Sequence, residues 1–512
     1  MSNKPAGKKV NIIGAGIAGL SVGCYLQKNG FRTQIFEKHS IPGGLCTSWQ
    51  IGDYTFDGCA HWILGTGPGS AFYKMWSELI DMQQLKTVNH EYRILLEVRE
   101  HANKYGNKSF YLYNDLDRLR NYLLDLAPED EGPVAELIGL VKALQQFDLP
   151  PVDYDDGWWR RLKRKMGRVR YLGLLRLFLK YRGQTNYTFA EKLKNPFLKE
   201  CFRLLYDDDE VDLMVIAVPM AAYDLRSAGY PVGGSLAFAR RLEEAYLDLG
   251  GKVHYKTPVL KIDTIGRNAR SITVRNNVIH EADYIISAGD WHHTIFDLLE
   301  GKYATPGQCR LGNLEVLQPF FSSIQCSFGI GKDLSHLPHF TRFPLDRPVV
   351  SPDGSVYHRF EIHNYSYDPT LAPSGKTCVV INFYSKNADF WIAQRKSNRA
   401  DYRALKQRFL EECAAIAAQK MGLEESDFEI MDISTPATFH RYTGNWKGST
   451  QGWLAGKNLL AASPVRLQVE GLNNVFLCSH WNQPGGGLPV ALKTGRDLAM
   501  LLCRIDGIRF RT

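Results

Sequence analysis

Apolar positions at two distant places in the chain predict the same local arrangement, a buried strand followed by a glycine-rich turn and a helix. Near the start, the apolar run 10–13 leads into a glycine turn, and a helical pattern then continues to Asn29 and Gly30. Near the end, the apolar run 475–478 leads into three glycines, and a helix is expected from about Leu488 with Pro489 in its first turn.

The middle of the chain predicts a sheet with covering helices. Residues 376–385, "KTCVVINFYS", are rich in β-branched and aromatic residues, which is typical of a strand. Farther on, four apolar residues recur at helical spacing and would share one face, and Gly422 follows as a helix stop. These four residues are Leu405, Phe409, Cys413 and Ile416.

The first glycine turn has the pattern of a dinucleotide-binding site. Gly14 permits the tight turn, Gly16 lets a pyrophosphate approach the amides at the helix N-terminus, and Gly19 lets the helix lie close to the strand. Ile17 and Ala18, between the last two glycines, would offer their amides to the same phosphates.

The second predicted strand ends at Glu37, 18 residues after Gly19. A carboxylate at this place accepts hydrogen bonds from a ribose 2′-OH and disfavours a 2′-phosphate. Lys38 follows it at the same edge of the predicted sheet. Strand, helix, second strand and acid occur in the expected order, which favours a true nucleotide site over a bare turn.

A second glycine pair follows at Gly43 and Gly44. This pattern resembles the flavin-dependent amine oxidase and phytoene desaturase superfamily, in which the loop wraps the FAD diphosphate. Many members continue the pair with Arg, whereas Leu45 and Cys46 stand here, so a phosphate contact from an arginine is not expected.

Later segments extend the resemblance over nearly the whole chain. The segment around Val259 is similar to the family strand whose backbone meets the adenine, and residues 281–290, which contain Ala288 and Gly289, resemble the strand that returns to the FAD domain. Residues 434–453 resemble the branch that holds carotenoid isomerases and retinol saturases. The C-terminal "PGGGLPVALKTGR" matches the family's flavin motif, which assigns the isoalloxazine contact to Gly485, Gly486, Gly487 and Leu488.

The resemblance implies an α/β fold, with a Rossmann-type FAD-binding domain of the amine oxidase kind and a discontinuous α+β substrate domain. We expect the FAD domain to comprise residues 1–80, 225–300 and 470–512, and the substrate domain residues 81–224 and 301–469. No second complete GxGxxG occurs, so a built-in NAD(P)H domain is not expected.

Composition and charge indicate where in the cell the protein is expected and which partners it contacts. The chain has 512 residues, 44% of them hydrophobic, with no signal-peptide pattern and ten scattered cysteines, which predicts a folded cytoplasmic protein. The formal charge is +8, but residues 158–182 hold ten Lys or Arg and no acid, so the remainder is close to −2. With Trp158 and Trp159, that segment suits peripheral attachment to the inner face of an anionic membrane, although a solvated helix fits equally well. Nucleic acid is not an expected partner, because no recognition module accompanies the charge.

Candidate catalytic residues are few. His61 follows the flavin loop and could move a proton while flavin moves a hydride, and His480 precedes the C-terminal glycines. Arg441 and Tyr442 could hold a polar end of a substrate. Each of these residues is also compatible with a purely structural role.

The expected function is FAD-dependent desaturation, saturation or isomerisation of carbon–carbon double bonds in a long apolar polyene of the carotenoid or retinoid kind. Hydride would move through flavin N5, and an external partner (NAD(P)H, a quinone or oxygen) would supply or remove electrons. The alternatives are the same chemistry on a fatty acid or a polyketide-derived polyene, including reductive cyclisation, then a flavin amine oxidase, and then a lipid-binding module resembling the GDP-dissociation inhibitors.

Overall fold

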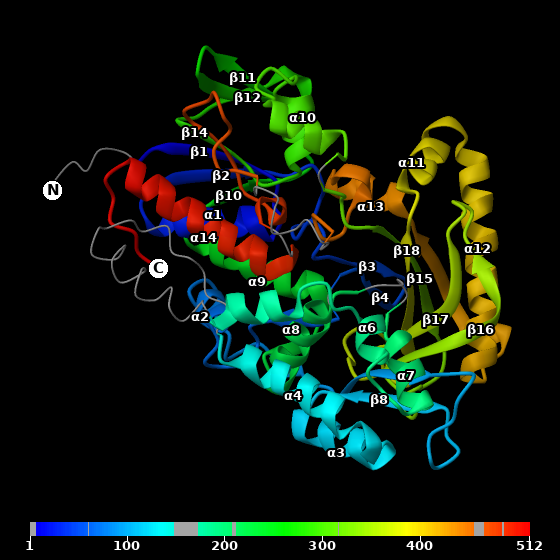
Figure 1. The fold of residues 1–512 in the computed structure, drawn as a ribbon. Coiled ribbons are helices and arrows are strands. Elements are labelled where there is room, and N and C mark those ends of the chain that lie inside the picture. The colour runs from blue at the N-terminus through cyan, green and yellow to red at the C-terminus, as the bar shows by residue number, and fades with distance from the viewer. Residues whose placement is uncertain are drawn as a thin grey trace.

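A five-stranded parallel sheet forms one half of the molecule in the computed structural model, which describes residues 7–59, 61–147, 173–206, 211–315, 317–454, 465–483 and 486–512 (Figure 1). The strand order is β10-β2-β1-β14-β20, and every neighbouring pair is parallel. Segments far apart in the sequence therefore meet in one sheet: β1 (Lys9–Ile13), β2 (Arg32–Phe36), β10 (Lys252–His254), β14 (Tyr284–Ser287) and β20 (Val475–Leu477).

Three helices pack together on one face of this sheet: α1 (Ile17–Lys28), α9 (Gly234–Asp248) and α14 (Gly487–Ile505). Figure 1 shows α14, in red, lying alongside α1, in dark blue. Small residues allow this approach, since a Cβ on Gly495 would lie 2.9 Å from Ser21 Cβ. The other face carries a small antiparallel sheet and a short π-helix: β11 (Val259–Ile265), β12 (Asn268–Val274), β13 (Ile279–Glu281) and η3 (His293–Leu298).

A seven-stranded sheet forms the second half, in the order β19-β15-β18-β17-β16-β7-β8. Its pairs are antiparallel except for β16 and β7, which run parallel. The strands are β7 (Tyr92–Glu97), β8 (Ser109–Tyr113), β15 (Ser322–Ile330), β16 (Phe340–Val350), β17 (Val356–Asn364), β18 (Thr377–Ser385) and β19 (Phe428–Ser434). The strand predicted over residues 376–385 is thereby confirmed as β18.

Two groups of helices accompany the large sheet. On one side lie α11 (Ala388–Ser397) and α12 (Arg399–Met421), and the left-handed Gly422 caps α12, as predicted. The predicted apolar face of α12, which includes Phe409 and Cys413, packs on the sheet. The second group packs with β7 and β8 and comprises α3 (Leu116–Leu126), α4 (Glu131–Gln145), α6 (Asn186–Ala190), α7 (Pro196–Arg203) and α8 (Leu213–Asp224).

Short sheets join the two halves. One is the pair β3 (Ser48–Ile51) and β4 (Tyr54–Asp57), and the other has the order β5-β9-β6, formed by β5 (Ile63–Leu64), β9 (Ala228–Pro231) and β6 (Thr87–Val88). The buried Asp57 carboxylate accepts hydrogen bonds from the N–H and the hydroxyl of Ser235, at the start of α9. The backbone carbonyl of Asp57 accepts another from Gln325 on β15. This residue therefore fixes a nucleotide-domain helix against the large sheet.

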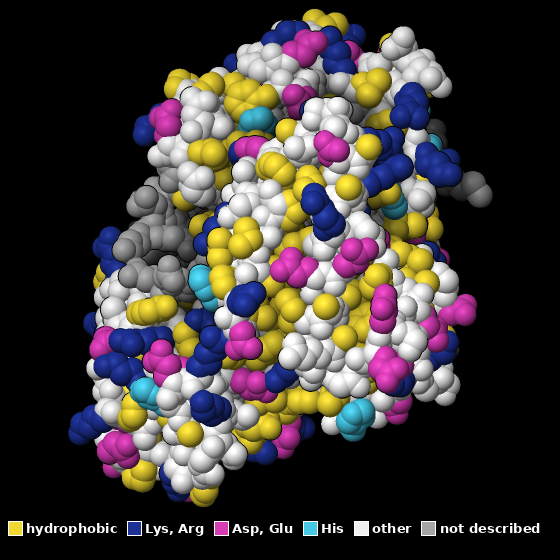
Figure 2. All heavy atoms as spheres, turned by 90° about the vertical axis from the view of Figure 1, so that its right-hand side faces the viewer, with side chains coloured by type: hydrophobic (Ala, Val, Ile, Leu, Met, Phe, Trp, Pro, Cys, Tyr) yellow, Lys and Arg dark blue, Asp and Glu magenta, His cyan; other side chains and the backbone are white. Residues whose placement is uncertain are grey.

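The charges on the surface and the length of the helices bear on the expected contact with a membrane. Figure 2 shows the face at the right of Figure 1, where Lys and Arg lie interspersed with Asp and Glu among hydrophobic side chains. Across the parts of the chain that the structure describes, none of the helices is both apolar enough and long enough to span a bilayer. Residues 158–172 of the basic segment lie outside the described residues. In the helix that follows, at residues 173–181, Leu175 and Leu179 are exposed.

Candidate active site

The first glycine turn has the geometry that its sequence predicts. Gly14 ends β1 with φ +102°, and its N–H donates to Phe36 O over 2.8 Å. A Cβ on Gly19 would lie 2.0 Å from Gly14 O, so glycine is required there for α1 to approach the strand. A Cβ on Gly16, the N-cap of α1, would meet only Gly43 O at 3.9 Å, which shows open space before the helix N-terminus. Ile17 and Ala18 form the buried first turn.

Glu37 lies at the carboxyl end of β2 and is 7% exposed. Its two carboxylate oxygens accept hydrogen bonds from the backbone N–H groups of Ala15 and His39, each over 2.7 Å. Each oxygen retains a lone pair for a further donor. Lys38 turns toward Gly444, where a Cβ would lie 3.1 Å from its Nζ, and burial lowers the pKa of Lys38.

The second glycine pair lies directly against the first turn. Gly43 N donates to Ala15 O over 2.8 Å, and Gly43 and Gly44 have φ values of +106° and +64°. A Cβ on Gly44 would lie 3.4 Å from the Cα of Gly16. Leu45 is partly buried and the Cys46 thiol is fully buried against Ser235 O, so neither position brings a charged side chain to the glycine pair.

Two more predicted contacts border the same space. The N–H of Ala288 donates to Ile13 O over 2.9 Å, and a Cβ on Gly289 would meet no atom within 4 Å. Val259 begins β11 and is 8% exposed. The adjoining Asp290 is buried and accepts hydrogen bonds from three backbone N–H groups, including that of Trp446 over 2.8 Å, and burial raises its pKa to about 6.

The C-terminal glycine motif returns to this edge of the sheet, because β20 is parallel to β14 and α14 begins just beyond it. Gly485 lies outside the described residues. Gly486 has φ +54°, and its Cβ would lie 1.7 Å from Gln451 O, so protein backbone already occupies that side of the residue. A Cβ on Gly487, the first residue of α14, would meet no atom closer than 3.8 Å, and Leu488 packs against the nucleotide-domain core.

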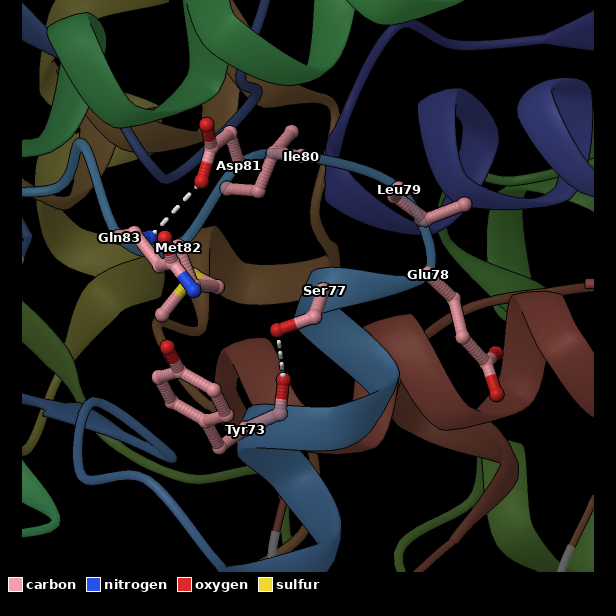
Figure 3. A pocket seen from close by; sticks show the side chains of 8 residues that line it. All are labelled: Tyr73, Ser77, Glu78, Leu79, Ile80, Asp81, Met82 and Gln83. Atoms are coloured by element: carbon pink, nitrogen blue, oxygen red, sulfur yellow. Dashed lines mark hydrogen bonds between the residues drawn. The ribbon is translucent and has the colours of Figure 1, made fainter.

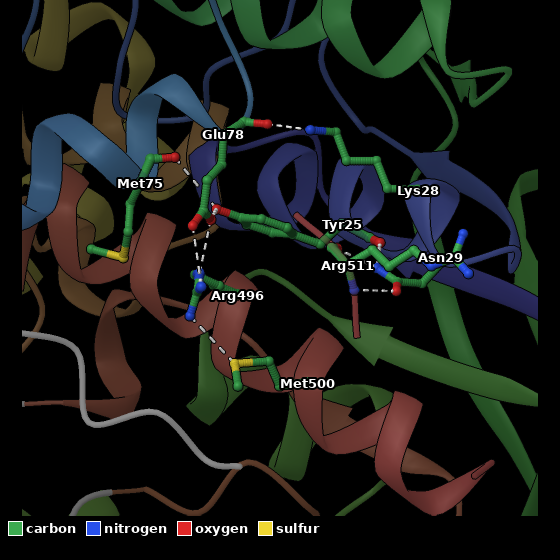
Figure 4. Close-up of polar contacts among 8 residues, drawn as sticks. All are labelled: Tyr25, Lys28, Asn29, Met75, Glu78, Arg496, Met500 and Arg511. Atoms are coloured by element: carbon green, nitrogen blue, oxygen red, sulfur yellow. Dashed lines mark hydrogen bonds and ion pairs between the residues drawn. The ribbon is translucent and has the colours of Figure 1, made fainter. Parts of the chain in front are cut away.

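A network of polar contacts holds the early and late parts of the chain together (Figure 4). The Glu78 carboxylate accepts hydrogen bonds from Tyr25 Oη at 2.7 Å and from Arg496 Nε and Nη2 at 2.8 and 3.1 Å. Tyr25 is on α1, Arg496 on α14, and Glu78 follows α2 (Ala71–Ser77). The Asn29 side chain also pairs with both backbone groups of Arg511. These contacts fix α14 beside α1.

His61 lies where the nucleotide domain meets the large sheet. Its Nδ1 is 2.9 Å from Tyr365 Oη, and its ring stacks on His363 with centroids 4.1 Å apart and planes 13° apart. The side chain has exposed surface, yet burial, with a smaller contribution from His363, lowers its pKa to about 3. The lowered pKa favours the neutral form of this imidazole.

A chain of polar groups continues from His61 across the large sheet. His363 Nε2 lies 3.5 Å from Glu361 Oε1, and Glu361 Oε2 accepts a hydrogen bond from Arg342 Nη2 at 2.5 Å. The Arg342 guanidinium is the main cause that holds the pKa of Glu361 down, at about 2, against the effect of burial. These residues are absent from the candidates that the sequence suggested. The alternation in "RFEIHN" could have indicated Glu361 and His363, since it places them on the strand face opposite the apolar Phe360 and Ile362.

The remaining predicted site residues lie elsewhere. Tyr442 is 44% exposed and packs edge-on against His39, and Arg441 lies over the Tyr442 ring. This pair, at the end of α13 (Pro436–Thr443), is therefore next to Glu37. His480 is partly buried in the short helix before the C-terminal glycines, close to Gly452, and burial lowers its pKa to about 4.

A separate hollow of about 380 Å³ opens beside α2 (Figure 3). It is lined by Tyr73 and residues 77–83. Its polar groups bond one another, since Ser77 Oγ donates to Tyr73 O and Gln83 N donates to Asp81 Oδ1. None of the glycines or histidines described above lines it.

Comparison with known proteins gives one family model that matches the N-terminal part of the chain and relatives that match most of its length. Residues 12–79 match a family model described as an NAD(P)-binding Rossmann-like domain. The 4,4'-diaponeurosporene oxygenase of Staphylococcus haemolyticus is 24% identical over 96% of this chain and 96% of its own length. The 4,4'-diapophytoene desaturase (4,4'-diapolycopene-forming) of a Methylomonas species is 22% identical over 98% of this chain and 97% of its own length. The chloroplastic prolycopene isomerase of Daucus carota is 23% identical over 86% of this chain and 71% of its own length.

Solved structures share the fold. An oxidoreductase from Methanosarcina mazei superposes with a TM-score of 0.59 at 18% identity, over 95% of this chain and 98% of its own. Putrescine oxidase bound to putrescine superposes with a TM-score of 0.56 at 13% identity, over 97% of this chain and 99% of its own. The chain is therefore an oxidoreductase that resembles carotenoid desaturases, oxygenases and isomerases over most of its length, and it shares its fold with putrescine oxidase.

Proposed function

We propose that the chain binds FAD and catalyses hydride transfer at carbon–carbon double bonds of a lipophilic polyene. The observation that carries this proposal is the open space at the carboxyl edge of the five-stranded sheet, where the N-termini of α1 and α14 both begin. Both helices follow parallel strands, so both direct their backbone N–H groups and partial positive charge toward the same edge.

The residues at this edge fit FAD. Glu37 would accept a ribose hydroxyl, and the amides of Gly16, Ile17 and Ala18 would hold the pyrophosphate, with Gly43 and Gly44 covering it. Lys38 and Leu45 would border the nucleotide, and Val259 would meet the adenine through its backbone. Ala288, Gly289, Gly486, Gly487 and Leu488 would face the ring system. The N-terminus of α14 would stabilise negative charge on the pyrimidine side of that ring.

The proposed position of FAD separates the chemistry that the cofactor would supply from the roles of the surrounding side chains. When bound, FAD would supply hydride transfer at N5, which no side chain provides. His61 is neutral at pH 7 and shares a hydrogen bond with Tyr365 Oη, so its role would be to orient the substrate and Tyr365 rather than to store a proton. Arg441 and Tyr442, beside His39, would serve the nucleotide end of the cofactor.

A polyene substrate is supported by the relatives' names, since those proteins desaturate, oxygenate or isomerise carotenoids. Desaturation would need an acceptor such as a quinone or oxygen, whereas saturation and isomerisation would need reduced flavin. The amine oxidase fold also supports a second candidate, amine oxidation, which would release peroxide with simple amines.

Peripheral membrane contact would suit a substrate that dissolves in the bilayer. The exposed Leu175 and Leu179 alternate with the exposed basic residues Arg176 and Lys180 in the helix at residues 173–181. A surface of this kind favours an anionic leaflet.

The test is the absorption spectrum of the purified protein. We expect a yellow protein with flavin bands and bleaching under anaerobic conditions when the correct reductant or substrate is added. A colourless protein that also fails to take up added FAD would refute the proposal. Peroxide release with amines, without any change in a polyene, would favour the amine oxidase candidate.

A further inference from the structure

Arg93, in the half that contains the large sheet, has no acidic partner among the described residues. Arg93 is on β7, and its Nη1 is buried with no hydrogen-bond partner among the described residues. No carboxylate of those residues forms an ion pair with it. A guanidinium removed from water is costly unless an anion or several acceptors surround it.

The neighbours of Arg93 supply only weak compensation. Its guanidinium carbon lies 5.9 Å from the ring centre of Tyr206 and 5.6 Å from that of Tyr223. The nearby Arg342 adds a second positive charge. Cation–π contacts of this kind contribute less than the cost of burying an unpaired charge.

Glu361, a buried acid on β17, is already engaged by other residues. Glu361 receives a hydrogen bond from Arg342 on one oxygen and lies near His363 on the other. Because Arg342 and Glu361 are direct partners across β16 and β17, their pairing is fixed by the register of the sheet. Within the part of the chain that the structure describes, Arg93 thus has no carboxylate partner and is available to a ligand.

Arg93 connects to the predicted reaction centre through two rings. Tyr223, at the end of α8, lies 5.6 Å from the ring of Trp62, and Trp62 directly follows His61. From the other side, Arg342, Glu361 and His363 lead back to His61 through stacked and hydrogen-bonded contacts. Arg93 and His61 therefore belong to one set of interior side chains.

We propose that Arg93 binds the carboxylate of the substrate, so that the natural substrate is an unsaturated or polyene acid and not a hydrocarbon. This inference rests on the proposed function, because it assigns the substrate class of the same site. A bidentate guanidinium–carboxylate pair at this place would supply the missing anion and anchor one end of the chain. The apolar remainder would then extend toward His61.

The experiment compares binding of a fluorescent conjugated acid with that of its ester. cis-Parinaric acid and its methyl ester are titrated into the wild type, Arg93→Gln and the matched control Arg347→Gln, whose arginine is exposed on neighbouring β16. We expect wild type and control to bind the acid roughly tenfold or more tightly than the ester. Arg93→Gln should lose that preference while its ester affinity and FAD content stay unchanged.

Equal affinities of the wild type for acid and ester would overturn the proposal. So would loss of ester binding or of FAD in Arg93→Gln, because it would show a structural or cofactor role for the arginine. If Arg93→Gln does not fold, Arg93→Lys replaces it and must still prefer the acid. A wild type that lacks flavin but prefers the acid would refute the proposed function and leave this inference standing.

Discussion

The imidazole rings of His61 and His363 stack 4.1 Å apart, although the two residues come from different halves of the molecule. His61 precedes β5 of the joining sheet, and His363 is on β17 of the large sheet. This contact places the edge of the predicted flavin site directly against the interior polar chain of the substrate side.

His61→Asn should separate catalysis from cofactor binding. Asparagine keeps a polar group but loses the stack on His363 and the position of the bond to Tyr365 Oη. We expect flavin content to stay at the wild-type level and turnover to fall by roughly 100-fold, the cost typical of a misplaced substrate. The measurement is the anaerobic rate at which a polyene reduces the oxidised flavin or reoxidises the prereduced flavin, and an unchanged rate would assign His61 to packing.

A second pair of stacked histidines predicts how stability depends on pH. His90 and His339 lie 3.8 Å apart, and burial lowers their pKa values to about 4 and about 3 from 6.5. Between about pH 6.5 and pH 4 the unfolded chain therefore binds more protons, and stability falls as the pH falls. Between pH 7 and pH 5, the free energy of unfolding should fall by about 2 kcal/mol less in His339→Phe than in the wild type.

Urea unfolding of wild type and His339→Phe at both pH values measures this difference, with the exposed His358→Phe as control. Parallel pH dependences in wild type and His339→Phe would contradict the prediction.

Two glycines of the first turn should respond differently to substitution. Gly16→Asp places its side chain in open space, so the apoprotein should fold normally while a carboxylate repels the pyrophosphate and flavin is lost. Gly19→Ala should instead lower stability, by about 1–3 kcal/mol or more, because its Cβ would overlap Gly14 O. Thermal unfolding and flavin absorbance distinguish the two effects. Retained colour in Gly16→Asp would place the pyrophosphate elsewhere.

The Glu78 network should stabilise the junction of α1, α2 and α14. Glu78→Ala removes the carboxylate that accepts hydrogen bonds from the buried Tyr25 and from Arg496. Removing one partner of a buried ion pair costs about 3–5 kcal/mol, and the lower end applies here because the pair keeps some exposure. Differential scanning calorimetry of Glu78→Ala, with the exposed Glu100→Ala as control, measures it. Equal melting temperatures would exclude a stabilising role.

Membrane contact can be tested on the described part of the basic segment. Replacing both Leu175 and Leu179 by Ser, or both Arg176 and Lys180 by Glu, should reduce flotation with vesicles that contain anionic lipid. Added salt should weaken wild-type binding, since the Debye length shortens to about 8 Å at physiological ionic strength. Flotation that changes neither with added salt nor with the charge reversal would contradict a role of this segment in membrane docking.

The sequence predicts the nucleotide half of the fold far better than the substrate half. The turn from Gly14 to Gly19, the acid at Glu37 and the stop at Gly422 are local signals, because each depends on the backbone or periodicity of a short segment. The contacts among Arg93, Arg342 and Glu361 depend instead on the register of three strands, including the parallel pairing of β16 with β7. No local pattern specifies which strands become neighbours, so the interior charges emerge only in three dimensions.

The position of β20 at the edge of the five-stranded sheet has a consequence for biosynthesis. Every other strand of that sheet leaves the ribosome earlier, yet β20 and α14 complete the edge at which the flavin ring is expected to lie. A nascent chain thus holds a nucleotide turn without its closing helix until translation of this region ends. The sheet edge beside β20 is therefore complete only after α14 has been synthesised.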